Sequence, residues 1–160
     1  TVTTEAVFDM FKDDVDDPLS YFRDISTFGG CTAGPAAALE NLRILEDEQL
    51  LDNATAMGAR LMDGLRALGD KHAVVGNVRG LGLFGGVELV ADRATREPLP
   101  EAKVASVAAA AMARGVQIGM TNRSLAGFNN VLLLSPALIA TPSDIDLIVD
   151  TVDEALATLG

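Results

Sequence analysis

The chain has little that would suit an oxidising compartment, a membrane or a nucleic acid. Cys31 is its single cysteine, which excludes an internal disulfide and is typical of the reducing cytosol. Only 12 of its 160 residues are lysine or arginine, against 23 acidic residues. The net charge of −11 argues against nucleic acids and anionic membranes as partners. No apolar run approaches the roughly 18 residues of a membrane span, and no signal peptide is recognisable, so we expect a cytoplasmic protein.

What the chain does have is apolar residues, which make up 49% of it and suffice for one domain or two small ones. Apolar spacing of three and four predicts helices, and short β-branched or Leu-rich runs between glycines predict strands. The expected helices cover residues 5–11, 35–47, 50–69, 101–114 and a last segment that begins at Thr141. The expected strands cover residues 74–75, 81–90, 116–120 and 131–134.

This order predicts an α/β arrangement in two parts. Residues 1–69 are expected to be mainly helical, and residues 70–160 to form a small layer of strands covered by helices. Local signals define several helix ends: Thr3 or Thr4 as a cap before Glu5, Gly69 as a stop, and Gly115 as a left-handed cap. Thr141, followed by proline and, three residues on, by an acid, predicts a capping box.

Residues 26–30 have the sequence Ser-Thr-Phe-Gly-Gly and precede a helix. Two hydroxyls and two permissive glycines beside a helix start can offer O–H and N–H donors to an anion, above all a phosphate. Such residues also occur in loops that bind nothing, so the run by itself leaves both interpretations open. The aspartates at residues 13–17 could bind a metal, but consecutive acids before a proline are typical of a solvated loop.

Three motifs in this order resemble the class III aminotransferases, which are pyridoxal-phosphate enzymes of the aspartate-aminotransferase fold. They are the Ser-Thr-Phe-Gly-Gly run at residues 26–30, the Arg-Gly-Leu-Gly-Leu run at 79–83 with Gly-Val-Glu-Leu at 86–89, and Leu-Ser-Pro-Ala-Leu-Ile at 134–139. The resemblance implies the C-terminal portion of such an enzyme. Residues 70–160 would be the small C-terminal domain, with helices on a small mixed or antiparallel sheet. Residues 1–69 would be the end of the large domain with its connecting helices.

The resemblance also implies which residues act. Ser26 and Thr27 would hold the phosphate of pyridoxal 5′-phosphate across the interface of a homodimer, in the site of the other subunit. Many relatives have His-Gly before this loop, where this sequence has Asp-Ile at residues 24–25. The lysine that forms the Schiff base would lie upstream, outside this chain, because Lys12, Lys71 and Lys103 have the surroundings of surface lysines. The chain alone would then be inactive.

The resemblance also concerns the residues that bind the substrate. Family members bind a substrate carboxylate with an arginine at positions that match Gly119 or Leu133, and neither can do so here. Arg123 in the polar segment 121–130 could substitute or could be a surface residue. Arg79 is expected in a glycine turn, binding backbone carbonyls. His72 is expected to have a surface role, while Cys31 is expected to be buried rather than reactive.

Two classes of function follow. The first is amino transfer from an amine or amino acid to a keto acid or aldehyde, or, on the same fold, an aminomutase that moves the amino group within one molecule. The second is a non-catalytic domain for dimerisation or regulation. In either case we expect small-molecule substrates or a protein partner, and no nucleic acid.

Overall fold

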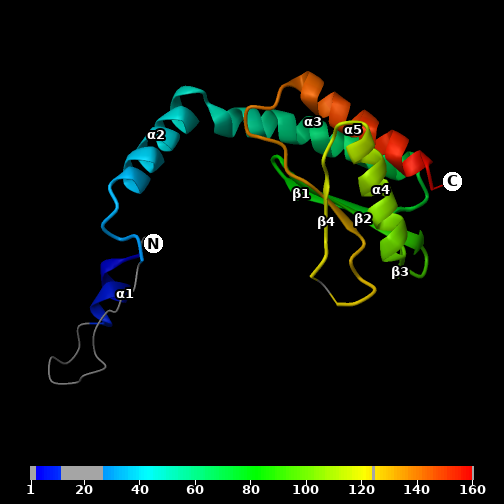
Figure 1. Cartoon of the computed structure of the whole chain (residues 1–160), viewed down its shortest axis with the longest axis horizontal. Coiled ribbons are helices and arrows are strands. Elements are labelled where there is room, and N and C mark those ends of the chain that lie inside the picture. Colours follow the sequence, from blue (N-terminus) through cyan, green and yellow to red (C-terminus); the bar gives the residue numbers. More distant parts are fainter. Residues whose placement is uncertain (1–2, 12–26, 124, 160) are drawn as a thin grey trace. The chain divides into compact units, whose positions relative to one another are not determined.

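The computed structural model describes residues 3–11, 27–123 and 125–159. The predictions for Lys12, for the acidic run at residues 13–17 and for Ser26 lie outside these ranges. The chain divides into two compact units, Thr1–Glu40 and Asn41–Gly160 (Figure 1). The domain boundary expected near residue 69 concerns a longer protein and stays a prediction.

The first unit contains α1 (Glu5–Asp9) and the beginning of α2 (Ala33–Asp47). Neither helix has a buried residue. Helix α1 is two residues shorter than predicted, and Thr4 occupies its N-cap position without a side-chain hydrogen bond, so the expected hydroxyl cap is wrong. Helix α2 begins two residues earlier than predicted.

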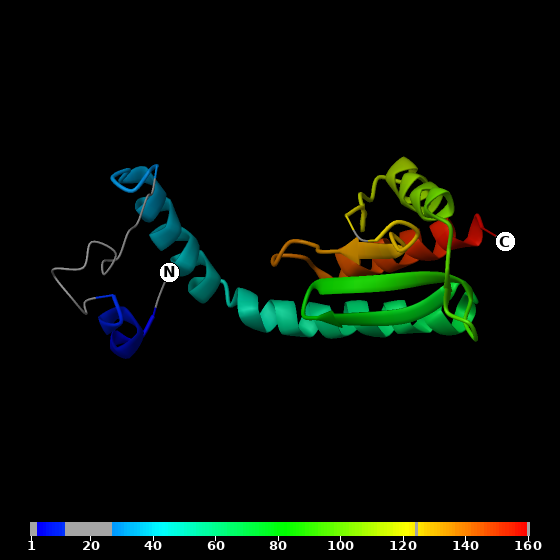
Figure 2. The same cartoon turned by 90° about the horizontal axis from the view of Figure 1, so that it is seen from below.

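The second unit is built on an antiparallel sheet, as the α/β interpretation with helices on a small sheet predicts. The strands lie in the order β1-β2-β5-β4, and β3 pairs with β2. The strands are β1 (Val75–Leu81), β2 (Phe84–Asp92), β3 (Glu97–Pro98), β4 (Gly119–Met120) and β5 (Val131–Leu134). The helices are α3 (Leu50–Lys71), α4 (Glu101–Ala113) and α5 (Pro142–Ala157). Figure 2 shows α3 running along the β1–β2 hairpin, with which it is in contact.

One hydrophobic core joins these helices to the sheet. Each helix contributes fully buried side chains at the spacing of three and four seen in the sequence, as in Leu61 and Leu65 of α3 and Val104 and Val107 of α4. The strands and the last helix complete it with Val87, Leu89, Leu132, Ile145, Val152 and Leu156. The amphipathic patterns therefore predicted the packing faces correctly.

Several element bounds differ from the prediction. The expected strand at residues 81–90 is wrong, because Leu81 pairs with Phe84 across a tight turn and the segment is the end of one strand and most of the next. Gly82 in that turn has φ +53°. Helix α3 continues past Gly69 to Lys71, and the strand expected at 116–120 is only Gly119–Met120. The caps at the other helices are confirmed: Gly115 has φ +87°, and Thr141 forms the capping box.

Ion pairs join α3 to α5 on the surface. Arg60 donates from Nε and a terminal nitrogen to the two oxygens of Asp146, each at 2.7 Å. At the other end of α3, the Lys71 Nζ and the His72 Nε2 lie 2.5 Å from the two oxygens of Asp153. Hydrogen bonds from Lys71 and then from His72 lower the pKa of the Asp153 carboxyl below its ordinary value of 3.8.

Replacing this carboxylate should change the response to acid. A depressed pKa in the folded state stabilises the fold above the ordinary pKa, and this stabilisation is lost as the pH falls through the folded value. Asp153→Asn should therefore lower the unfolding midpoint by about 3 °C at pH 7, with a difference that shrinks from about pH 5 down to pH 3. Asp150→Asn on the same helix is the control, since Asp150 forms no ion pair among the described residues. A difference that stays constant with pH would contradict the role of the charge.

Candidate anion and substrate site

The turn at residues 27–30 is open to solvent and contains unused hydrogen-bond donors. The Cys31 N–H closes it by donating to the Phe28 carbonyl at 2.9 Å. Among the described residues, the Thr27 hydroxyl has no hydrogen-bond partner, and a methyl group at Gly30 would meet nothing within 4 Å. Cys31 is exposed, so its expected burial is wrong for this structure. The turn offers the hydroxyl and the accessible backbone that a bound anion needs.

This donor set fits the phosphate of pyridoxal 5′-phosphate. An ionised phosphate binds to hydroxyl and N–H groups held in a fixed frame. Thr27 supplies one such hydroxyl, and glycines at residues 29 and 30 leave the backbone uncovered. Ser26, the other predicted phosphate ligand, lies outside the described residues.

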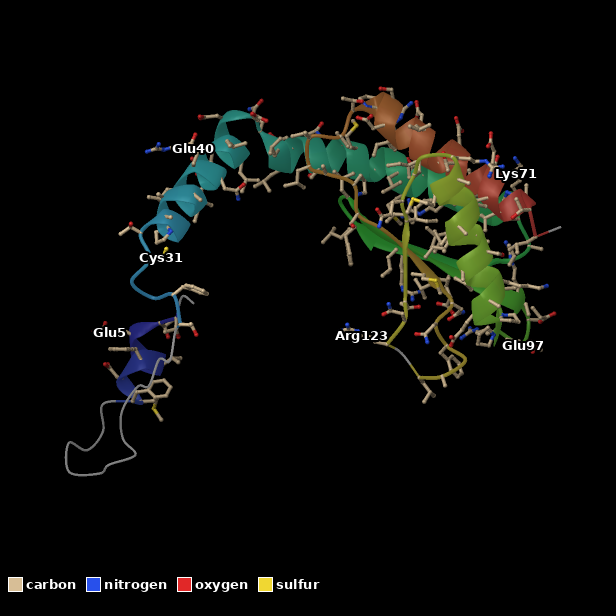
Figure 3. The ribbon with its side chains drawn as sticks, in the orientation of Figure 1. Glu5, Cys31, Glu40, Lys71, Glu97 and Arg123 are labelled. Carbon is tan, nitrogen blue, oxygen red and sulfur yellow. The ribbon has the colours of Figure 1, made fainter. Side chains whose placement is uncertain are left out.

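The two described lysines are engaged elsewhere or exposed. Lys71 is the last residue of α3, and its ammonium group binds Asp153 (Figure 3). Lys103 lies on the exposed surface of α4, in its first turn. Both have the surface surroundings that the sequence predicts.

Arg123 lies in the long connection between β4 and β5. Its side chain is exposed and points away from the sheet (Figure 3). Among the described residues it forms no ion pair. An exposed guanidinium without an acidic partner can bind an external carboxylate.

The other limb of this connection is firmly held. The Gly127 N–H and the Asn129 side-chain amide both donate to Oε1 of Glu101, each at 3.0 Å. The Asn130 amide, which is buried, donates to the Leu89 carbonyl at 2.6 Å. The sequence showed these asparagines only as turn formers. Their position directly before a strand was the available signal, but their partners lie 28 and 41 residues away in the chain.

Gly119 and Leu133, the two positions at which the resemblance would lead us to expect an arginine, are directly opposite each other on β4 and β5. A methyl group at Gly119 would lie 3.3 Å from the Leu133 Cβ. The two positions therefore share one place on the sheet, and here that place is apolar. No carboxylate can be bound by a charge there.

The predictions for Arg79 and His72 are corrected by the contacts of their side chains. Arg79 is not in a turn: it lies in β1 opposite Gly86, and its guanidinium binds Glu88 at 2.7 Å. Arg93, which the sequence analysis missed, is the residue that binds backbone carbonyls. His72 is only 12% exposed at its side chain and binds Asp153, which is a structural role at the end of α3.

Two kinds of feature are absent from residues 3–11, 27–123 and 125–159. No three histidine, cysteine or acidic side chains there lie close enough together to hold a metal ion. None of the helices in those ranges is both long and apolar enough to cross a membrane.

Comparison with known proteins extends the resemblance over almost the whole chain. The family model described as aminotransferase class-III matches residues 5–156. The chain is 65% identical over 156 residues to a hypotaurine/taurine–pyruvate aminotransferase of Paracoccus denitrificans and 64% identical over 159 residues to a taurine–pyruvate aminotransferase of Rhodobacter capsulatus. These matches cover 98% and 99% of the chain but 34% and 35% of the relatives, so the chain spans about a third of their length.

Solved structures agree with the fold. A Bacillus anthracis aminotransferase superimposes with a TM-score of 0.89 at 37% identity, over 96% of this chain and 34% of that one. An amine transaminase from an uncultivated Pseudomonas species, solved with pyridoxal phosphate bound, gives a TM-score of 0.78 at 35% identity, over 87% of this chain and 30% of that one. The arrangement of helices and sheet described above is thus a recurring part of much longer chains.

Proposed function

Because the chain belongs to the class-III aminotransferase family, we propose that it is part of an enzyme that transfers the amino group of taurine to pyruvate. The observation that carries the proposal is identity of 64–65% over nearly the whole chain to enzymes named for this reaction. The two solved structures described above share only 37% and 35% with it.

The chain's own contribution to cofactor binding is the turn at residues 27–30. Thr27, together with Ser26, donates hydrogen bonds to the phosphate of pyridoxal 5′-phosphate, and the glycines allow the backbone to approach. The cofactor supplies an electron sink for removing an amino group from one carbon and adding it to another. We assign the phosphate to the partner subunit's site, which makes the enzyme a homodimer, and the Schiff-base lysine to a part of the enzyme outside this chain.

Arg123 is the chain's candidate for binding the acidic end of the substrates. Taurine carries a sulfonate and pyruvate a carboxylate, so both reactants present oxygen anions that a guanidinium can bind with two parallel hydrogen bonds. The Gly119–Leu133 pair supplies no charge for this purpose. Support for Arg123 comes from its exposure and from its lack of an acidic partner among the described residues.

The test compares amino donors that differ only in their acid group. In the whole enzyme carrying this chain, loaded with cofactor, alanine formation from pyruvate should be at least tenfold more efficient in kcat/KM with taurine than with β-alanine, its carboxylate counterpart. This tenfold corresponds to about 1.4 kcal/mol of transition-state binding.

The other outcomes separate the alternatives. Alanine formed from β-alanine but not from taurine would overturn the substrate assignment and leave the reaction class intact. Conversion of a single substrate without pyruvate would indicate an aminomutase. An enzyme that binds the cofactor and transfers no amine would support the non-catalytic alternative.

A further inference from the structure

We propose that Glu101 is a positioning residue for substrate recognition: its carboxylate holds the β4–β5 connection, residues 121–130, so that Arg123 is presented to the substrate anion. This inference rests on the role proposed above for Arg123. It adds that Glu101, which lies on a different element at the start of α4, positions Arg123 for binding.

The base of the connection is closed by two hydrogen bonds between Thr121 and Val131. The Thr121 N–H donates to the Val131 carbonyl at 3.0 Å, and the Val131 N–H donates to the Thr121 hydroxyl at 3.2 Å. These bonds fix where the connection leaves and rejoins the sheet. They do not fix the residues between them. Within this part the Phe128 N–H donates to the Leu125 carbonyl at 2.9 Å, and contacts with other elements set the rest of its course.

Glu101 provides the contacts that reach furthest along the connection. A single oxygen, Oε1, accepts from both the Gly127 N–H and the Asn129 side-chain amide. Hydrogen bonds to an ionised carboxylate are stronger than those between neutral groups. Glu101 also lies in the first turn of α4, where the helix dipole favours its negative charge.

The element that carries Glu101 is rigid. Val104 and Val107 of α4 are completely buried in the core, so the carboxylate is presented from a fixed helix. Asn129 is itself 8% exposed, and its neighbour Asn130 is tied to the Leu89 carbonyl on β2. The returning limb is thereby fixed to both a helix and a strand, whereas the outgoing limb with Arg123 is exposed and depends on the returning limb for its position.

Loss of the Glu101 carboxylate should therefore weaken substrate binding, although Glu101 itself does not contact the substrate. Arg123 precedes Gly127 by four residues, so displacement of the returning limb moves the guanidinium and weakens its binding of the substrate anion, which raises KM. For Glu101→Ala in the holoenzyme we expect the KM for taurine to rise about tenfold with kcat within twofold. Glu101→Gln keeps an amide oxygen at the same place as an acceptor. It should therefore reverse at least half of the rise in KM, measured on a logarithmic scale.

A double-mutant cycle tests whether Glu101 acts through Arg123. Arg123→Ala should raise the KM for taurine at least as much as Glu101→Ala, and the double variant should be no worse than Arg123→Ala alone. Glu97→Ala is the matched control, because Glu97 is an exposed acid on the neighbouring β3 whose carboxylate forms no hydrogen bond or ion pair with the described residues of the connection. It should leave the KM unchanged within twofold.

A second readout needs no activity. Hydrogen–deuterium exchange of the holoenzyme, followed by mass spectrometry of peptides that cover residues 121–130, should show faster exchange in Glu101→Ala, partial recovery in Glu101→Gln and no change in Glu97→Ala. Unchanged exchange in Glu101→Ala would overturn the proposal. Faster exchange with an unchanged KM would overturn it as well, because the anchor would then have no part in recognition.

Failure of the proposed function would look different. A wild-type enzyme that does not accept taurine would be recognised before any variant is made, and the cycle would then be measured with the donor that it does accept. Equal rises in KM for Glu101→Ala in the presence and absence of Arg123 would refute the positioning role while leaving amino transfer intact.

Discussion

Gly58→Ala should destabilise the fold by about 3 kcal/mol, the largest effect that we expect of any single methyl group in this chain. Gly58 lies in α3 and faces the β1–β2 turn. A methyl group there would lie 2.4 Å from both the carbonyl carbon and the oxygen of Gly82, and 2.5 Å from its Cα. Backbone atoms cannot rotate away as a side chain can. The helix and the hairpin would have to move apart, which would loosen the packing of Leu61 and Met62 beneath them.

A second glycine of the same helix gives the control. A methyl group at Gly69 would lie 3.7 Å from the Val75 Cγ1, an ordinary van der Waals contact. Gly69→Ala should therefore be neutral or stabilise the chain by up to about 1 kcal/mol, because alanine favours the helix over glycine. Urea-induced unfolding followed by circular dichroism measures both variants. Equal stabilities for the two would show that α3 and the turn do not approach each other closely.

This contact gives a physical reason for the glycines of the Arg-Gly-Leu-Gly motif. A methyl group at Gly80 would lie 2.5 Å from the Phe84 carbonyl oxygen and 2.8 Å from the Met62 sulfur. The sequence predicted strands between glycines and the helix spacing, and both are confirmed except that a turn at residues 82–83 divides the expected strand. It did not show that the glycines of the two elements face each other, because no local pattern encodes which helix will lie against which turn.

The same limit applies to the candidate site. Turn-forming residues at 121–130 and the hydroxyl–glycine run at 26–30 are local features, and they were visible in the sequence. The partners of the β4–β5 connection are not local: Glu101 binds Asn129 across 28 residues, and Leu89 binds Asn130 across 41. The roles of Ser26, Thr27 and Arg123 remain predictions, and they rest on family motifs as well as on chemistry.

Arg93 has the carbonyl-binding role that the sequence predicted for Arg79, and this assignment can be tested. It follows β2 and donates from Nε to the Val75 carbonyl at 2.9 Å and from a terminal nitrogen to the His72 carbonyl at 2.7 Å and to the Gly69 carbonyl. The last carbonyls of a helix have no partner within it, and a positive charge there complements the helix dipole. One side chain thus satisfies the end of α3 and ties it to β1.

Arg93→Ala should cost about 2–3 kcal/mol of unfolding free energy, since three carbonyls lose a charged donor. Arg93→Lys should recover less than half of this, because an ammonium group cannot reproduce the planar fork that reaches all three. Urea-induced unfolding again provides the measurement. A lysine variant as stable as the wild type would show that a single charge near the helix end suffices.

Two further arginines separate this role from a general effect of charge. Arg66→Ala removes an exposed pair with Asp63 three residues earlier on α3 and should change stability by about 0.5 kcal/mol or less. Arg79→Ala removes the pair with Glu88 on the sheet surface and should cost less than about 1 kcal/mol. Arg79→Ala could instead lower the unfolding free energy as much as Arg93→Ala. That result would support the original prediction that Arg79 binds backbone carbonyls. The contacts predict the opposite order, because Arg93 donates to the Gly69 and His72 carbonyls at the end of α3, whereas Arg79 binds a carboxylate on the sheet surface.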